Sequence, residues 1–297
     1  MQIKNWILAA RLRTLGAAVA PVLIGTALAF GEGYRAWPAA LAALLCALLL
    51  QVGTNYANDY FDFRKGADTA ERLGPTRVTQ AGLIAPEQVR NAFLLVFALV
   101  ALPGAYLVYR GGWPILLLGV LSVLSGVIYT GGPFALAYVG LGDLFVLLFF
   151  GGVATGATYY TQSGQISPLV LLASLGPGLL STAILTVNNL RDRLTDAKTG
   201  KKTLAVRFGA GFARAEYLAC WLGALAVPPL IWLAFAPERP GVLLACLTAI
   251  PARKAIQKVF SLDADPALNP LLGQTGKLLL IYSLLFSLGW LLGGVSG

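Results

Sequence analysis

Long uncharged stretches separated by short charged segments make up most of this 297-residue chain. Nine stretches have about the 20 apolar residues that a helix needs to cross a membrane, namely 14–31, 37–58, 90–109, 113–131, 139–161, 167–188, 214–235, 240–257 and 272–295. Between Gly111 and Leu190 the single charged residue is Asp143, a density that a soluble helical protein would not show. The pattern predicts an all-α membrane protein, built as a bundle of nine transmembrane helices.

The composition excludes several classes of protein and of catalytic site. Charged residues make up 12% of the chain and hydrophobic residues 57%, whereas soluble domains carry about 25% charged residues. Histidine is absent, which excludes a histidine base, a histidine metal ligand and a Ser-His-Asp triad. The three cysteines, Cys46, Cys220 and Cys246, lie inside apolar stretches and are expected to be buried thiols, not a disulfide framework.

Basic residues are distributed unevenly between the two sides of the predicted bundle. All but three of the 22 Lys and Arg residues fall at the N-terminus or in the loops after the second, fourth, sixth and eighth stretches, the exceptions being Arg35, Arg110 and Arg239. Since cytoplasmic loops are enriched in Lys and Arg, the N-terminus is expected to be cytoplasmic and the C-terminus outside. The net charge of +9 then has a membrane explanation, and no nucleic-acid partner is expected.

Two clusters of amide and carboxylate side chains interrupt the apolar pattern, at 55–68 (NYANDYFDFRKGAD) and 188–196 (NNLRDRLTD). They hold five of the 13 acidic residues, and each closes an apolar stretch. Asp59 and Asp192 lie 133 residues apart, which is about four spans. We therefore predict one membrane domain over 1–297, with a parallel four-helix repeat (first half 1–137, second half 138–260) and a final helix in 261–297.

Helical spacing predicts that the two clusters form one site. At 100° per residue, the polar side chains of each cluster share a helix face, and Gly66 allows the chain to turn Asp68 back toward the others. Carboxylate and amide oxygens are ligands that suit Mg²⁺, which would relieve the repulsion among the acids. The residues of the predicted faces are Asn55, Asn58, Asp59, Asp62, Asn188, Asp192 and Asp196.

Basic residues interleave with these acids: Arg64, Lys65, Arg72 and Arg77 near the first cluster, and Arg191, Lys198, Lys201 and Lys202 near the second. Carboxylates, Mg²⁺ and Lys or Arg together are typical of a polyphosphate site, and a hydrophobic bundle beside it favours a lipid diphosphate. A cation-coupled transporter is the alternative outside enzymes. It predicts acids at mid-membrane depth, whereas these clusters lie at helix ends near loops.

Several motifs resemble one known family. They are NDYFDFRKGAD at 58–68, YTGGPFALAYVGLGDLFV from Tyr129, FFGGVATGATYY up to Tyr160, NNLRDRLTDAKTGKKTLAVRFG at 188–209 and LNPLLGQTGK at 268–277. The chain resembles the UbiA superfamily of intramembrane prenyltransferases, and within it the 1,4-dihydroxy-2-naphthoate polyprenyltransferases. In that branch the last aspartate of the first motif stands six residues after Asp62, as Asp68 does; in the 4-hydroxybenzoate branch it stands four residues on, where this chain has Gly66.

The resemblance implies a reaction. It is the Mg²⁺-dependent transfer of a polyprenyl group from polyprenyl diphosphate to 1,4-dihydroxy-2-naphthoate, with decarboxylation to demethylmenaquinol in menaquinone biosynthesis. The protein would lie in the bacterial plasma (inner) membrane, with the mouth of its active site on the cytoplasmic side. Another aromatic acceptor, 4-hydroxybenzoate or homogentisate, stays open.

The resemblance also implies roles for individual residues. Metal ligands are expected at Asn58, Asp59, Asp62, Asp68, Asp192 and Asp196. Asp62, Asp192, Lys65 and Arg191 are expected to be catalytic. Contacts to the substrates are expected from Asn55, Lys65, Arg77, Asn188, Asn189, Lys201, Tyr129, Asp143 and Tyr160. Asp143 and either Arg11 or Arg13 would place the aromatic acid, and the rings of Tyr129, Tyr159 and Tyr160 would face an allylic cation.

Overall fold

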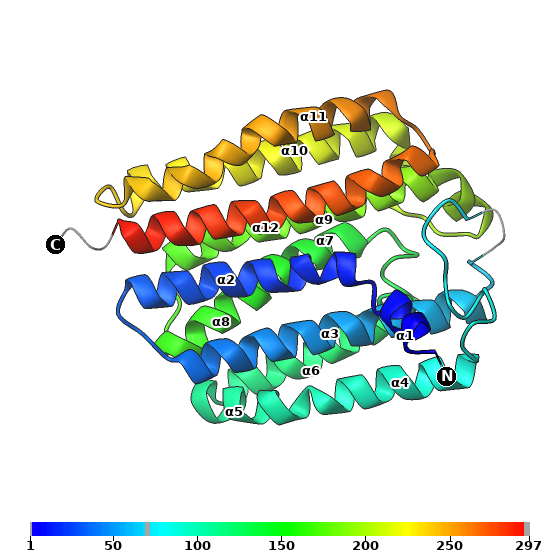
Figure 1. The fold of residues 1–297 in the computed structure, drawn as a ribbon, viewed down its shortest axis with the longest axis horizontal. Helices are drawn as coiled ribbons and strands as arrows, with labels where there is room; N and C mark the ends of the chain where they lie inside the picture. Colours follow the sequence, from blue (N-terminus) through cyan, green and yellow to red (C-terminus); the bar gives the residue numbers. More distant parts are fainter. Residues whose placement is uncertain (1, 69–71, 294–297) are drawn as a thin grey trace.

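The computed structural model describes residues 2–68 and 72–293, and in these two ranges every regular element is a helix (Figure 1). The elements are α1 (Ile3–Ala10), η1 (Leu12–Thr14), α2 (Leu15–Gly31), α3 (Trp37–Arg64), α4 (Pro86–Leu99), α5 (Ala101–Gly111), α6 (Trp113–Ile128), α7 (Gly142–Leu147), η2 (Leu148–Val153), α8 (Ala154–Ser163), α9 (Pro168–Lys198), α10 (Leu204–Ala234), η3 (Pro240–Thr248), α11 (Ala249–Ser261), η4 (Pro266–Leu268) and α12 (Asn269–Leu292). They lie side by side in an elongated bundle (Figure 1).

Helix length and composition make this an integral membrane protein. Among the described residues, seven helical stretches are long and apolar enough to cross a membrane: Ile3–Gly31, Trp37–Arg64, Pro86–Gly111, Gly142–Ser163, Pro168–Lys198, Leu204–Ala234 and Pro266–Leu292. Two expected spans fall outside this set, because Trp113–Ile128 has only 16 residues and 240–261 combines a 3-10 segment with a helix that carries Arg253, Lys254 and Lys258. The prediction of an all-α membrane fold is confirmed, and the count of nine spans stays a prediction.

The first span begins earlier than the hydropathy pattern indicates. Helix α1 starts at Ile3, and a break at Arg11, whose φ is +51°, separates it from α2. The amide Nδ2 of Asn55 on α3 holds this break, since it donates to the carbonyl of Ala10 over 2.9 Å and to Thr14 Oγ1 over 3.0 Å. A contact distant in sequence therefore decides where the first helix bends.

Helices α3 and α9 carry the two polar clusters beyond the apolar part of the bundle. With 28 and 31 residues, they are about 42 and 46 Å long at 1.5 Å per residue, against a hydrocarbon layer of about 30 Å. After α3 the chain turns at Gly66, whose φ is +66°, and the Ala67 amide donates back to the Asp62 carbonyl. The predicted turn at Gly66 is confirmed.

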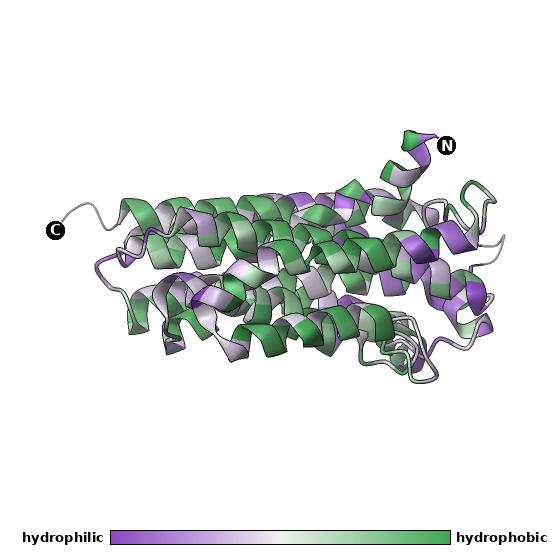
Figure 2. Ribbon diagram, turned by 90° about the horizontal axis from the view of Figure 1, so that it is seen from below, coloured by the Kyte–Doolittle hydropathy of each residue, from purple (hydrophilic) through white to green (hydrophobic). Residues whose placement is uncertain are grey.

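Polar and apolar residues separate along the bundle axis. Figure 2 shows hydrophilic segments gathered at the end that holds α1 and the loops after α3 and α9, while the middle of the bundle is hydrophobic. Helix α12 ends at the opposite end from α1 (Figure 1). Close backbone contact supports the central helices: a Cβ on Gly178 of α9 would lie 2.8 Å from the Leu147 carbonyl, so only glycine fits there.

Candidate active site

A cavity of about 1460 Å³ runs inside the bundle from the polar end toward the opposite end. Its walls include residues of α2, α3, α5, α6, α7, η2, α8 and α9. Its apolar part reaches Val108, Ile115 and Thr161, close to the far ends of α5, α6 and α8. Its polar end is lined by Arg11, Arg13, Asn55, Asn58, Asp62, Arg72, Arg77, Asn188, Asn189, Arg191, Asp192, Asp196, Lys201 and Asn269. Both clusters thus contribute residues to one cavity, which has a charged end and an apolar end.

Asp62 is the most connected acid of the first cluster. It is 1% exposed, and its Oδ2 accepts a hydrogen bond from Arg77 Nη2 over 3.1 Å. Its Oδ1 accepts from the Tyr138 hydroxyl over 2.9 Å and lies 3.4 Å from Lys201 Nζ. The buried carboxylate is therefore neutralised by two cations and oriented by a phenol.

Arg191 organises the second cluster. It is fully buried, and its Nε and Nη2 contact both oxygens of Asp192 at 2.8 and 2.6 Å. Its Nη2 also donates to Asn188 Oδ1 over 2.7 Å, and its Nη1 donates to Asn269 Oδ1 over 2.8 Å. The guanidinium is thus held by residues of α9 and α12, and this fixes its position at the wall of the cavity.

Lys201 joins the two clusters. Its Nζ lies 3.4 Å from Asp62 Oδ1 on α3 and 4.0 Å from Asp196 Oδ1 on α9. The loop that carries it is anchored nearby, because the Lys202 amide donates to the Tyr138 carbonyl over 2.9 Å. One ammonium group therefore lies between acids that are 134 positions apart in the chain.

Asp59 and Asp68 face the loop after α3 and are not among the residues that line the cavity. Asp59 Oδ2 accepts from the Val78 amide over 3.2 Å, and Asp68 Oδ1 contacts Arg72 Nη1 at 2.7 Å. Burial raises the pKa of Asp68 to about 6, against the opposing effect of Arg72. The structure thus separates the acids that face the cavity from those that hold the adjoining loop in place.

Tyr138 lies in the loop between α6 and α7 and was not expected in the site. Lys65 Nζ lies 4.3 Å from the centre of its ring and Lys201 Nζ lies 5.0 Å from it, both within the range of a cation–π interaction. Lys65 Nζ also donates to the Gly132 carbonyl over 2.8 Å. Burial and the neighbouring Asp62 raise the pKa of the Tyr138 phenol, so it stays a hydrogen-bond donor.

The donor set fits a hard divalent cation. Asp62, Asp192 and Asp196 reach the cavity together with the amides of Asn58 and Asn188, and these oxygens suit Mg²⁺. Within the described ranges no three acidic groups converge closely enough to form a metal cluster; the carboxylates of Asp62 and Asp192 pair instead with Arg77, Arg191 and Lys201. Among the described residues, Asp59 Oδ1 has no hydrogen-bond partner, and Asp68 Oδ2 has an ion-pair contact with Arg77 Nε at 3.4 Å; neither acid lines the cavity.

Other expected residues are divided between the cavity and its surroundings. Tyr129 and Asn189 line the cavity, and Asp143 lies behind Asn189, whose Nδ2 is 3.5 Å from Asp143 Oδ1. Tyr159 and Tyr160 lie near the far end of α8, where the Tyr159 hydroxyl donates to Glu32. The structure therefore does not bring Tyr159 and Tyr160 together with the aspartates of the two polar clusters.

The structure adds two further residues to the site, Asn269 and Gly74. Asn269 accepts from Arg191 and donates its Nδ2 to the Leu73 carbonyl over 2.8 Å, so it ties α12 to the loop after α3. Gly74 lies against Arg191, since a Cβ there would be 2.7 Å from Arg191 Nη2. Asn269 falls in the matched stretch at 268–277 and Tyr138 in the one from Tyr129, and this was the available signal for both.

Known proteins resemble the chain over nearly its whole length. The chain is 38% identical to the 1,4-dihydroxy-2-naphthoate octaprenyltransferase of Haemophilus influenzae, over 98% of this chain and 97% of that one. It is 37% identical to the Escherichia coli protein of the same name, over 96% and 94%. A UbiA homologue from Archaeoglobus fulgidus, solved bound to DMAPP and Mg²⁺, has the same fold with a TM-score of 0.64, at 16% identity over 95% of this chain and 99% of that chain.

A family-wide match agrees with these relatives. Residues 18–271 match the UbiA prenyltransferase family, and this range includes both polar clusters and the loop of Tyr138. The chain belongs to the UbiA prenyltransferase family.

Proposed function

We propose that this protein transfers a polyprenyl group from polyprenyl diphosphate to 1,4-dihydroxy-2-naphthoate, with loss of CO₂, in menaquinone biosynthesis. The observation that carries the proposal is the cavity that joins two acidic and basic clusters at one end to a long apolar interior. Such a space matches a ligand with a polyanionic head and a hydrocarbon tail. The names of the two bacterial relatives support the choice of acceptor.

The donor head is proposed to bind between α3 and α9. Arg77, Arg191 and Lys201 would contact the diphosphate oxygens, since guanidinium groups and a lysine bind phosphate through charge-assisted hydrogen bonds. Lys65 lies beside Lys201 across the Tyr138 ring and would add charge at the mouth of the cavity. The prenyl tail would extend along the apolar walls toward Val108 and Ile115.

Mg²⁺ is proposed as the metal, held by the cavity-facing oxygens of Asn58, Asp62, Asp192 and Asp196 with help from Asn188 and Asn189. Asp59 and Asp68, the other two ligands expected from the sequence, face the loop after α3 and would support the site from outside the cavity. The A. fulgidus homologue solved with Mg²⁺ and the donor set of this cavity support this choice. When bound, Mg²⁺ supplies positive charge that stabilises a leaving diphosphate. The carboxylates of the protein would hold the bound Mg²⁺ in position.

The reaction needs little base chemistry. The C–O bond of the donor breaks with its electron pair going to the diphosphate, and Arg77, Arg191 and Lys201 stabilise the developing negative charge. The face of Tyr129, at the cavity wall, would stabilise the allylic cation. The electron-rich ring carbon that bears the carboxylate then attacks; a C–C bond forms, and loss of CO₂ returns the electron pair that restores aromaticity.

The membrane arrangement is part of the proposal. We infer that α6 and the segment 240–261 also cross the bilayer, which gives nine spans with the N-terminus cytoplasmic. The distribution of Lys and Arg supports this orientation. The acidic clusters and the mouth of the cavity would then face the cytoplasm at the bacterial inner membrane. The two halves, 1–137 and 138–260, would form a repeat within one domain, followed by the final helix.

The direct test uses purified protein with a polyprenyl diphosphate, Mg²⁺ and either 1,4-dihydroxy-2-naphthoate or 4-hydroxybenzoate. Product is expected from the naphthoate, and its formation should stop when EDTA removes the metal. Turnover with the benzoate alone would refute the acceptor, and turnover that persists in EDTA would refute the metal. Asp62→Asn and Asp192→Asn should abolish turnover, whereas Asp263→Asn, on an exposed ion pair with Arg193, should not.

A further inference from the structure

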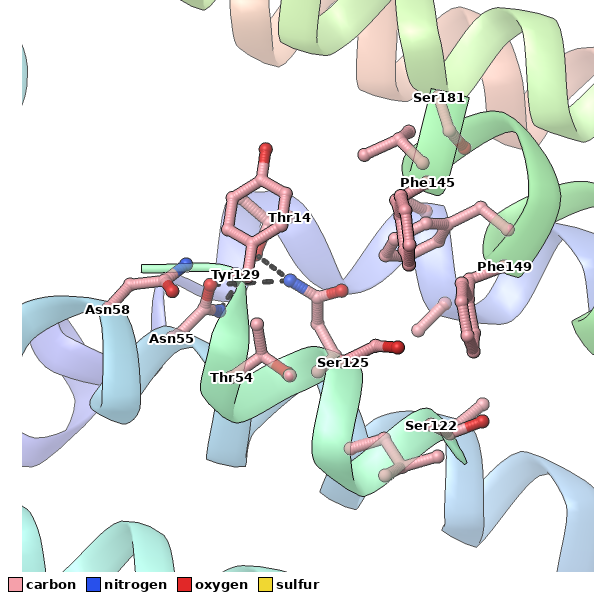
Figure 3. Close-up of a pocket in the computed structure, with 18 of the residues that line it drawn as sticks. Thr14, Thr54, Asn55, Asn58, Ser122, Ser125, Tyr129, Phe145, Phe149 and Ser181 are labelled. Atoms are coloured by element: carbon pink, nitrogen blue, oxygen red, sulfur yellow. Dashed lines mark hydrogen bonds between the residues drawn. The ribbon is translucent and has the colours of Figure 1, made fainter. Parts of the chain in front are cut away.

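One wall of the cavity carries a pair of stacked phenylalanine rings. Phe145 of α7 and Phe149 of η2 have ring centres 5.9 Å apart and planes inclined by 12°. Both side chains line the cavity, and Figure 3 shows them beside Ser181 of α9, with Tyr129 between this wall and the polar residues Asn55 and Asn58. The segment η2 is a π-helix, a local widening of the helix that occurs often at functional sites.

The hydroxyl of Ser181 has no hydrogen-bond partner within residues 2–68 and 72–293. The residue is 4% exposed, its Oγ makes no hydrogen bond, and it lines the cavity. Among the buried hydroxyls that lack a partner in 2–68 and 72–293, it is the one on the cavity wall. Two other hydroxyls that line the cavity are satisfied: Thr158 Oγ1 donates to the Ala154 carbonyl over 2.7 Å and Ser122 Oγ to the Leu118 carbonyl over 2.7 Å.

We propose that Phe145, Phe149 and Ser181 form the binding site of the aromatic acceptor, a planar two-ring phenol carrying a carboxylate. The rings would stack on the acceptor, and the Ser181 hydroxyl would pair with the acceptor hydroxyl that is remote from the carboxylate. This inference rests on the proposed function and assigns the acceptor its place in the cavity.

A hydrocarbon tail is a poor occupant for this wall. An unpaired buried hydroxyl carries a desolvation cost that a prenyl chain, which has no hydrogen-bonding group, cannot relieve. A phenol relieves it and also offers a flat face to the two phenyl rings. The apolar wall formed by Gly104, Val108 and Ile115 has no such hydroxyl and suits the tail better.

The position along α9 agrees with the chemistry. Ser181 precedes Asn188 by seven residues, which places it about 10 Å deeper in the bundle at 1.5 Å per residue. An acceptor that reaches from Ser181 toward Asn188 would present its carboxylate-bearing carbon near the diphosphate end. Tyr129 would then lie beside the reacting carbons, since its hydroxyl is near Gly142 at the start of α7, 3.1 Å from where a Cβ on that glycine would be.

The test compares two ligands and two serine variants of the full chain in lipid nanodiscs. Binding of 1,4-dihydroxy-2-naphthoate and of 1-hydroxy-2-naphthoate, which lacks the remote hydroxyl, is measured by titration. Ser181→Ala is expected to weaken binding of the dihydroxy compound about two- to tenfold, the value of one hydrogen bond, and to leave the monohydroxy compound unchanged. Ser174→Ala is the matched control, because Ser174 is also buried on α9 but donates to the Leu171 carbonyl and does not line the cavity.

Steady-state kinetics supply the second readout. Phe145→Leu should raise the KM for the acceptor about two- to tenfold, from the loss of aromatic stacking, with the KM for the donor unchanged. Phe208→Leu is the control, since Phe208 and Phe212 form a pair with ring centres 5.0 Å apart, and Phe208 is 62% exposed on the outside of the bundle.

The outcomes separate the two ideas. Turnover of wild-type protein with 1,4-dihydroxy-2-naphthoate supports the proposed function, and turnover with 4-hydroxybenzoate alone refutes it. With turnover present, a Ser181→Ala variant that binds both naphthoates like wild type overturns the acceptor site. If Phe145→Leu raises the KM for the donor and not that for the acceptor, the acceptor site is also overturned, because that result would place the prenyl tail on this wall. Wild-type protein that binds neither naphthoate refutes both ideas.

Discussion

Replacing Lys201 with methionine tests how the two clusters work together. The Nζ of Lys201 lies 3.4 Å from Asp62 Oδ1 and 4.0 Å from Asp196 Oδ1. At an effective dielectric constant of 20, these distances correspond to gross attractions of about 5 and about 4 kcal/mol. The lysine is 9% exposed, so its desolvation offsets most of this attraction, and the net value of such a charged contact is about 1.5–3 kcal/mol.

The sign of the effect differs between the two ligands. Mg²⁺ binding alone must displace the ammonium from Asp62, so Lys201→Met should raise the affinity for Mg²⁺ about ten- to a hundredfold. A diphosphate binds partly through that same ammonium, so its affinity should fall about tenfold or more. A simple structural defect would lower both affinities, and this opposition makes the prediction specific.

Isothermal titration in detergent measures both quantities, first with MgCl₂ and then with inorganic pyrophosphate at saturating Mg²⁺. Lys202→Met is the matched control, because Lys202 is the adjacent lysine and is exposed, and both affinities should stay near wild type. Unchanged or weaker Mg²⁺ binding in Lys201→Met would show that the lysine does not compete with the metal, and the reasoning would fail.

Three further predictions concern other parts of the chain. Tyr138→Phe keeps the ring beside Lys65 but removes the hydroxyl that donates to Asp62. It should therefore raise the Mg²⁺ concentration needed for half-maximal turnover more than it raises the KM for the donor, whereas Tyr138→Leu should raise both. Equal effects of the two variants would show that the ring and the hydroxyl do not have separate roles. Gly289→Ala puts a Cβ 1.8 Å from the Gly241 carbonyl and should lower stability by about 1–3 kcal/mol, seen as a lower Tm, with Gly273→Ala as a control on the same helix in open space. Burial raises the pKa of Asp68 to about 6, so its contribution to stability is full below its ordinary pKa of 3.8 and is lost as the pH rises through 6. Tm measured between pH 4 and 7 in EDTA should therefore fall less steeply with rising pH in Asp68→Asn than in wild type. An equal dependence of Tm on pH in the two proteins would count against the raised pKa.

The sequence was sufficient to predict the fold class but not its local backbone. Uncharged length identifies a membrane helix because the bilayer demands it, and seven of the nine expected stretches meet the criteria of length and hydropathy. The break at Arg11 depends instead on the Asn55 amide, 45 residues away from the Ala10 carbonyl to which it donates. No local pattern records such a contact.

The composition of the site could be predicted, but not which way each side chain faces. Helical spacing places Asn58, Asp59 and Asp62 on one face, yet Asp59 accepts from the Val78 amide while Asp62 faces the cavity. The difference comes from the loop after α3, which folds against that face. Tyr138 was missed for the same kind of reason, since a tyrosine in a loop gives no sign of the two lysines that it will meet.

Charge balance explains why the clusters interleave acids with bases. Four acids that are deeply or partly buried contact four basic residues: Asp62, Asp68, Asp192 and Asp196 against Arg72, Arg77, Arg191 and Lys201. Adding Mg²⁺ alone leaves excess positive charge in a low-dielectric cavity, and adding diphosphate alone leaves excess negative charge; each is costly. Adding both lets carboxylates pair with metal and cations pair with phosphate, so the site should favour the Mg²⁺–diphosphate complex over either component.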